Sequence, residues 1–186
     1  MKQITETVYV ETGYRLPNVS CILTEEGAVL VDSPFLPSEA KDWRNKIDKL
    51  TDKGIAYIVN TDWHFDHMLG NCFLGNRVIA HNRSLKGFLH YKKKGNLLAD
   101  IKMFFPKEYP LWENELKAVD VNLPQITFQM SLIYAWVAKW FSLNGWVGII
   151  RELFGYIIPR KKCFSLVIIS KIKDIRICGE PGLMLC

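Results

Sequence analysis

Short runs of apolar and β-branched residues dominate the first part of the chain. Residues 1–10 and 18–24 alternate or run apolar, and both stretches predict β-strands. Ala28 to Val31 forms a further buried run, which follows a Glu-Glu-Gly turn and ends at Asp32. This order predicts a β-hairpin built from a strand, a tight turn and a second, buried strand.

The next stretch changes to helical spacing. Ser38 is suited to be a helix N-cap, and Gly54 stands where a glycine would stop the helix. Between them the apolar positions are Ala40, Trp43, Ile47 and Leu50. Ile55 to Val59 then predicts a buried strand, which ends in a polar loop that starts at Asn60. Because strand, helix and strand alternate, we expect an α/β fold in which the two kinds of element form layers.

Shorter patterns continue to Phe128. We expect a strand at residues 78–80, a helix after Asn82 that breaks near Gly95, a loop marked by Pro106 and Pro110, a helix at residues 111–118 and a strand from Ile126.

Beyond Phe128 the character of the sequence changes. Residues 129–138 and 140–150 carry no charge, and Lys139 separates them. A membrane-spanning helix needs about 20 apolar residues, so we expect no membrane span. A membrane-associated protein through residues 132–158, which could lie in the interface as an amphipathic helix, stays open as an alternative.

Composition adds limits on the class of protein. The chain has 186 residues, of which 49% are apolar and 23% charged, as expected for one globular domain. The five cysteines are widely spaced without a CxxC pair, and the first residues lack a signal-peptide pattern, so we expect a cytoplasmic protein with reduced thiols. The net charge of +5 lies entirely beyond residue 128. We therefore assign it to that segment and expect no nucleic-acid partner.

The chemistry is concentrated directly after the predicted strand at residues 55–59. Asp62, His64, Asp66 and His67 place four potential metal ligands within six positions of one loop. Ligands with this spacing can converge beyond the end of the strand, where open α/β sheets bind their ligands. Imidazole and carboxylate groups suit zinc, and also iron or manganese. Gly70 would allow close backbone packing beside the loop.

The stretch NTDWHFDHMLGN, residues 60–71, resembles the His-x-His-x-Asp-His signature of the metallo-β-lactamase superfamily. The matching residues are Asn60, Thr61, His64, Asp66, His67, Gly70 and Asn71. The resemblance covers residues 1–128 and implies an αββα sandwich with one or two metal ions. By position, it implies that His64 binds a first metal, that Asp66 and His67 bind or orient a second, and that Asp66 orients the attacking water or acts as general base. The nucleophile would be a metal-activated water.

The sequence departs from this family in two ways. Asp62 stands where the family has its first histidine; it could be a ligand or a solvated turn residue. The downstream ligands are missing, because no histidine follows His90. We therefore divide the chain into a metallo-β-lactamase-like half, residues 1–128, and an atypical or truncated second half, residues 129–186. We hypothesise that the second half is a frame-shifted continuation, which translation of the coding DNA in its other two frames would test.

Two functions from different classes remain. The first is a metal-dependent hydrolase that acts on a small molecule. The second is a catalytically inactive, truncated or frame-shifted relative with weak or no metal binding. Asp32 could support the metal loop or only cap a strand end. We expect His81 to be a buried structural histidine and His90 an exposed helix residue. A sandwich with only one half would expose an apolar sheet face, which favours homo-oligomers.

Overall fold

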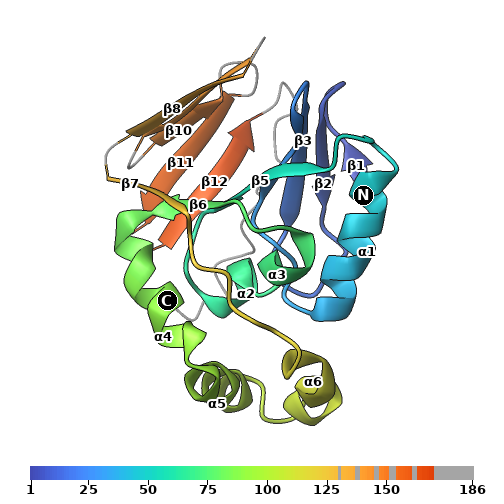
Figure 1. Cartoon of the computed structure of the whole chain (residues 1–186), viewed down its shortest axis with the longest axis vertical. Helices are drawn as coiled ribbons and strands as arrows, with labels where there is room; N and C mark the ends of the chain where they lie inside the picture. The colour runs from blue at the N-terminus through green and yellow to red at the C-terminus, as the bar shows by residue number, and fades with distance from the viewer. Residues whose placement is uncertain (130, 137–138, 145–146, 151–153, 161–162, 170–186) are drawn as a thin grey trace.

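The computed structural model describes residues 1–129, 131–136, 139–144, 147–150, 154–160 and 163–169. A seven-stranded sheet runs through the chain in the sequence order β1 to β7 (Figure 1). Its strands are β1 (Lys2–Gln3), β2 (Val8–Glu11), β3 (Val19–Thr24), β4 (Gly27–Val31), β5 (Ile55–Asn60), β6 (Val78–His81) and β7 (Ile126–Phe128). The first four strands pair antiparallel and the last four parallel, so the sheet is mixed. The α/β class predicted from the sequence is confirmed.

The predicted hairpin is present as β3 and β4. Its turn needs Gly27, which has a positive φ of 126°. A Cβ at this position would also lie 2.8 Å from the carbonyl oxygen of Gly54, so the residue must be small as well as permissive.

The helix between β4 and β5 is α1 (Pro37–Asp48), and two details of its predicted ends are wrong. Ser38 lies inside the first turn, because Pro37 occupies the first helical position, for which its fixed φ is suited. The carboxylate of Glu39 accepts the backbone N–H of Leu36 instead of a serine cap. The helix ends at Asp48, so Gly54 does not stop it; Gly54, with a φ of 71°, forms the turn into β5.

Between β5 and β7 the chain forms five further helical segments. They are α2 (Phe65–Met68), α3 (Asn71–Leu74), α4 (Leu85–Lys92), α5 (Lys94–Phe104) and α6 (Tyr109–Leu116), with a short 3-10 turn at Asn82–Ser84 before α4. The predicted break near Gly95 falls at Lys93, whose ψ of 98° is not helical. Gly95 lies within the first turn of α5, where backbone N–H groups have no helical partner in any case.

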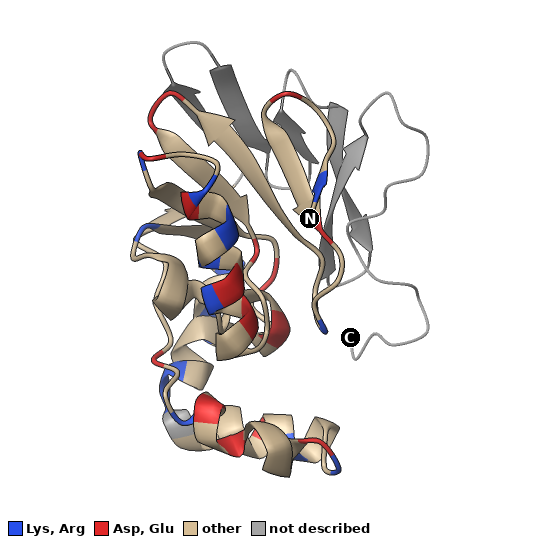
Figure 2. Cartoon of the chain, turned by 90° about the vertical axis from the view of Figure 1, so that its right-hand side faces the viewer, with Lys and Arg blue, Asp and Glu red and all other residues tan. Residues whose placement is uncertain are grey.

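Among the described residues, two apolar cores lie on the helical side of the sheet. One joins alternate residues of β3 and β4, such as Cys21 and Leu30, to Trp43 and Ile47 of α1. The other joins the loop after β4 and the segment of α2 to α4, α5 and α6, and it is rich in aromatic side chains. These helices extend below the sheet in Figure 1. Acidic and basic residues are interspersed along these helices (Figure 2).

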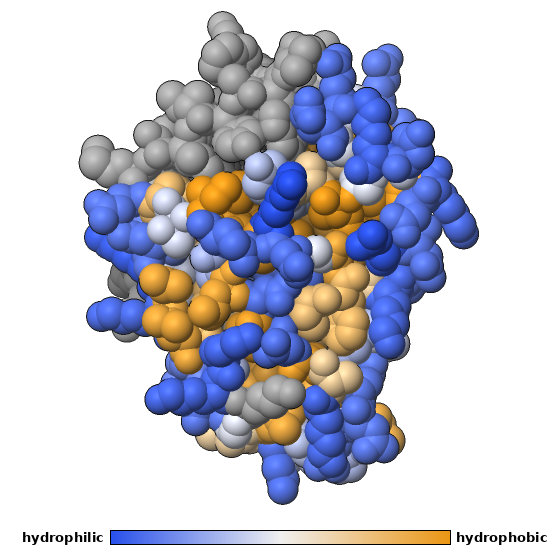
Figure 3. All heavy atoms as spheres, viewed as in Figure 1, coloured by the Kyte–Doolittle hydropathy of each residue, from blue (hydrophilic) through white to orange (hydrophobic). Residues whose placement is uncertain are grey.

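The opposite face of the antiparallel strands is also buried. It consists of Val8, Val10, Ser20, Ile22, Val29 and Val31, which are cross-strand neighbours. The exposed apolar face that we would expect of half a sandwich is therefore not found over these strands. Hydrophilic residues instead dominate the edge of the molecule near α1 and the β3–β4 hairpin (Figure 3).

The chain beyond Phe128 contains further strands. They are β8 (Ser131–Trp136), β9 (Lys139–Asn144), β10 (Val147–Ile150), β11 (Phe154–Arg160) and β12 (Cys163–Ile169). They form a three-stranded and a two-stranded antiparallel sheet, so the alternative of an interfacial helix over residues 132–158 is wrong where the structure describes them. Within the described ranges, no helix has the length and apolar character to cross a bilayer.

Candidate metal centre

The sequence-predicted ligands lie at the carboxyl ends of the central parallel strands: Asp62 and His64 in the loop after β5, and Asp66 and His67 in the short helix α2 that follows it. The loop leaves β5 at Asn60 and enters α2 at Phe65. The neighbouring strand β4 ends beside it, because the backbone N–H of Asp32 donates to the carbonyl of Val59 at 2.9 Å. Parallel pairing therefore brings Asp32 next to residues that follow it by about thirty positions.

Asp32 organises this end of the sheet. Its carboxylate accepts hydrogen bonds from the backbone N–H of Thr61 at 2.8 Å and from the Thr61 hydroxyl at 2.6 Å. It also lies 3.0 Å from Nδ1 of His67. Asp32 is buried and has a positive φ of 58°, a conformation that costs free energy for any residue with a Cβ. These contacts hold it there, so Asp32 supports the metal loop and does not merely cap a strand.

His67 is fixed at both its backbone and its ring. Its carbonyl accepts from the side-chain amide of Asn60 at 2.7 Å and from the backbone N–H and hydroxyl of Ser33 at 3.0 and 3.1 Å. Because Nδ1 faces Asp32, the other ring nitrogen, Nε2, is turned towards Asp66, at 3.6 Å from its carboxylate. A carboxylate on one ring nitrogen is the usual way in which proteins orient a metal-binding histidine.

The asparagines and the glycine of the motif have structural roles. Asn71 donates to Asn60 at 2.7 Å, and Asn60 in turn donates to His67, so both asparagines fix the loop. A Cβ on Gly70 would lie 2.6 Å from the carbonyl oxygen of Pro34. This confirms that the position needs a glycine for close backbone packing.

Asp62 and His64 form the second pair. Oδ1 of Asp62 lies 2.8 Å from Nδ1 of His64, and it accepts the backbone N–H groups of Trp63 at 2.5 Å and of His64 at 3.2 Å. Asp62 is buried, whereas His64 remains partly exposed. The same oxygen therefore shapes the turn and holds the imidazole.

Two aromatic residues between the ligands were not predicted as part of the site. Trp63 and Phe65 alternate with the acidic and imidazole groups, and both pack into the aromatic core beneath the loop. The ring of Trp63 stacks on His64, with ring centroids 4.4 Å apart and planes at 20°. Trp63 precedes the helix and Phe65 begins α2, so no single periodicity of the motif marks both as core residues.

The electrostatics of the loop favour protonated histidines. The hydrogen bond that His64 donates to Asp62 raises the pKa of His64, against the opposing effect of burial. Burial also opposes a charge on His67, but the carboxylates of Asp32 and Asp66 outweigh it and raise the pKa of His67 well above its ordinary value. Burial would raise the pKa of Asp62, yet the hydrogen bond with His64 and the charge of His67 lower it. A metal cation must therefore compete with protons for these nitrogens.

The donors fit zinc by type and only in part by geometry. Two ligands of one tetrahedral zinc ion lie about 3.4 Å apart, because each zinc–ligand bond is about 2.1 Å long. The 3.6 Å between His67 Nε2 and Asp66 matches this spacing, whereas the 2.8 Å between His64 and Asp62 is a direct hydrogen bond. Across the described ranges, no group of three or more His, Cys, Asp or Glu side chains is arranged to hold a metal ion.

The other histidines lie outside this arrangement. His81 is buried, and its Nε2 lies 2.8 Å from the carbonyl oxygen of Gln129. His90 is half exposed on α4, close to Asp100. Both match the structural roles predicted for them. Cys72, close to the loop, packs against the aromatic core with its thiol directed to the carbonyl of Leu69.

The fold and the loop together define a class of protein: an α/β protein with a metallo-β-lactamase-type metal loop after its central strand. The sequence model of the metallo-beta-lactamase superfamily matches residues 13–124. The chain therefore belongs to the metallo-beta-lactamase superfamily. A comparison with curated proteins gave no match.

Solved structures of the superfamily share the fold. A subclass B3 metallo-beta-lactamase of Bradyrhizobium japonicum superposes with a TM-score of 0.54 at 18% identity, over 98% of this chain and 63% of that one. A metallo-beta-lactamase from Pontibacter korlensis gives 0.53 at 17% identity, over 76% and 57%. A metallo-beta-lactamase family protein from Thermus thermophilus gives 0.53 at 14% identity, over 89% and 57%. The chain thus spans about three fifths of the length of these proteins.

Proposed function

We propose that the protein is a metal-dependent hydrolase that acts on a small molecule. One observation carries the proposal: Asp32 holds Nδ1 of His67, so that Nε2 is presented to the same point as the carboxylate of Asp66. A histidine that served only as a core residue would not need a strained, buried aspartate behind it.

The residues of the loop would have different roles in metal binding and catalysis. His67 and Asp66 would hold one ion, and His64 with Asp62 would contribute to a second or complete the first. When bound, zinc, iron or manganese supplies Lewis acidity and a water of lowered pKa. Asp66, which is partly exposed, would orient that water or accept its proton. The superfamily includes hydrolases of lactams, thioesters, phosphoesters and sulfate esters, and the fold does not select among them.

A second candidate is a relative of these enzymes that has lost catalysis. The contacts of Asp62 favour it, because its Oδ1 already accepts two backbone N–H groups and bonds His64 directly. An aspartate committed in this way acts as a turn residue, and His64 would have to exchange its partner to reach a metal. A catalytic zinc site needs three protein ligands, and the described donors are arranged in pairs.

Metal content distinguishes the two candidates. The purified protein is analysed for zinc, iron and manganese beside a His64→Ala, His67→Ala double variant and a His90→Ala control, which removes a half-exposed histidine away from the loop. A hydrolase predicts near-stoichiometric metal in the wild type and the control, and its loss in the double variant. Equal traces in all three proteins would contradict metal binding and favour the inactive relative.

If metal is present, hydrolysis is tested with one chromogenic substrate from each ester or amide class. The expected result is activity towards at least one class that disappears on chelation and returns with added zinc. Activity that survives chelation and the double substitution would show that the loop is not the site.

A further inference from the structure

Helix α4 carries a glycine where it packs against Trp63 of the metal loop. Gly87 is buried, and an ideal Cβ built on it would lie 2.0 Å from Cε3 of Trp63 and 2.1 Å from its Cδ2. Real Cβ atoms do not approach other atoms so closely, so any larger residue would displace the indole. The absence of a side chain at Gly87 thus creates a notch in α4, and Trp63 fills it.

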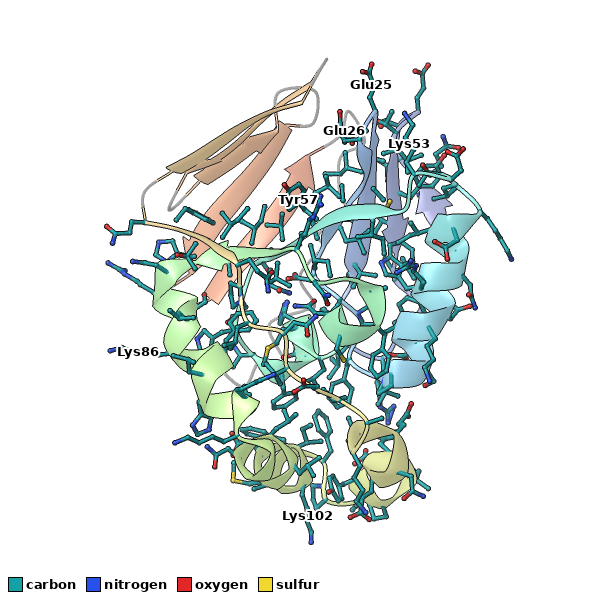
Figure 4. All side chains as sticks on the ribbon, viewed as in Figure 1. Glu25, Glu26, Lys53, Tyr57, Lys86 and Lys102 are labelled. Atoms are coloured by element: carbon teal, nitrogen blue, oxygen red, sulfur yellow. The ribbon has the colours of Figure 1, made fainter. Side chains whose placement is uncertain are left out.

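Helix formation does not explain this glycine. Glycine within a helix costs about 1 kcal/mol relative to alanine. Gly87 lies in the first turn of α4, as the third residue of a helix that continues to Lys92, and its φ is not positive, so neither a C-terminal cap nor a turn requires a glycine there. Its neighbour Lys86 points outwards to solvent (Figure 4), whereas Gly87 faces the body of the molecule. The position of the Trp63 ring is the feature that requires it.

The indole transmits this contact to a predicted metal ligand. Trp63 stacks on His64 at 4.4 Å between ring centroids, and it also contacts Tyr91 of α4, at 5.9 Å. Two contacts therefore define the His64 ring: the hydrogen bond from Nδ1 to Asp62 and the face of Trp63. A shift of the indole by the length of one bond would move or release the imidazole.

We propose that Trp63 is a positioning residue for His64 and that the Gly87 notch on α4 fixes where Trp63 lies. The effect that we expect on metal affinity rests on the proposed metal-binding function. The dependence of the His64 ring position on Gly87, through Trp63, does not rest on that function.

A double-mutant cycle tests the link. Gly87→Ala, Trp63→Ala and the double variant are titrated with zinc in competition with a chromophoric chelator. We expect each single variant to weaken zinc binding by at least about tenfold, as for other groups that orient ligands. The double variant should be no weaker than Trp63→Ala, because Gly87 acts only through the ring. Gly95→Ala is the matched control: a Cβ there meets nothing within 4 Å, and affinity should not change.

The metal-free protein provides an independent measurement. The stacked indole should shift the His64 ring-proton NMR signals upfield, and this shift should be lost in Trp63→Ala and reduced in Gly87→Ala. Trp63→Phe should retain part of it, and Trp63→Leu should not, although both fill the core. These two variants keep the test valid if Gly87→Ala does not fold.

The outcomes separate the two proposals. If the wild type binds no zinc but the upfield shift depends on Gly87, the positioning contact stands and the metal function fails. If zinc binds and the Gly87→Ala and Trp63→Ala effects simply add, the positioning role is overturned. An unchanged His64 spectrum in Trp63→Ala would overturn it directly.

Discussion

The described part of the chain contains two clusters built around buried carboxylates, and they are neutralised differently. In the first, Glu11 pairs with Lys46 at 2.8 Å and with the amine of Met1 at 2.7 Å. Lys46 also bonds Asp42 at 2.7 Å and lies over the ring of Tyr14. In the second, the metal loop, the ion pairs of Asp32, Asp62 and Asp66 in the described residues are with His64 and His67 alone.

The difference shows what the second cluster is suited to bind. A lysine or an amine keeps its charge at neutral pH, so the Glu11 cluster is complete without a ligand. Imidazoles carry charge only when protonated, and they lose it when they bind a metal. Three carboxylates matched by two histidines therefore favour either protons or a divalent cation.

The largest effect is expected from removal of Asp32. Asp32→Ala leaves the N–H of Thr61 and a charged His67 without their main acceptor and places an alanine at a positive φ. Loss of one partner of a buried pair costs about 3–5 kcal/mol, so the free energy of unfolding should fall by that order in urea denaturation.

Asp32→Asn is the matched control for that measurement. Asparagine tolerates the positive φ and can still accept from Thr61, so the fold should be retained. Without the carboxylate, His67 loses its fixed tautomer, and zinc affinity should fall about 10- to 100-fold. Wild-type affinity in Asp32→Asn would show that this contact does not orient the ligand.

The next largest effect on stability is expected at Glu11, which Lys46 and the Met1 amine neutralise. Burial would raise the pKa of Glu11, but hydrogen bonds from Lys46 and the Met1 amine lower it from 4.5 to about 2. A depressed pKa contributes stability above pH 4.5 that is lost as the pH falls towards 2. Glu11→Gln should therefore lower the free energy of unfolding by about 2–3 kcal/mol at pH 7 and by almost nothing near pH 2. Thermal unfolding at the two pH values measures this difference. Metal addition should not alter this difference.

The pH dependence of the metal loop should have the opposite sign. The pKa of His67 is raised above 6.5, so its contribution to the stability of the metal-free protein is complete below pH 6.5 and declines as the pH rises. The change should be smaller than for Glu11, because a neutral imidazole can still donate Nδ1–H to Asp32. Unfolding curves of wild type and His67→Gln in chelator, between pH 6 and 9, measure it. Parallel curves would contradict the charged His67.

How much of this contrast the sequence could predict depends on distance along the chain. The ligands of the metal loop are adjacent in sequence, and the motif therefore predicts them directly. Asp32 and His67 both follow parallel strands, so the contact between them could have been predicted. The role of Asp32 was nevertheless left undecided. The contact of Trp63 with Gly87 depends on which face α4 turns to the loop, and no local pattern specifies that face.

The dependence on tertiary contacts also explains why the predicted ends of helix α1 were wrong. Ser38 has the chemistry of an N-cap, but Leu36 holds that position two residues earlier, Pro37 begins the helix, and Glu39 supplies the acceptor. Gly54 was placed at a helix end because glycine favours positive φ there, and it uses the same freedom in the turn before β5. Residue type predicted the local conformation, but tertiary packing selected the position.

The smallest effect is expected at Asp62, and it decides between the two roles that this residue could have. Asp62→Asn keeps an oxygen that can accept the N–H groups of Trp63 and His64, so the turn should survive. Because the acceptor of the His64 hydrogen bond loses its charge, the free energy of unfolding should fall by about 1 kcal/mol. If Asp62 is only a turn residue, zinc affinity should stay within about twofold of wild type. If it is a ligand, affinity should fall at least about tenfold, because an amide oxygen replaces a carboxylate in the coordination of the ion.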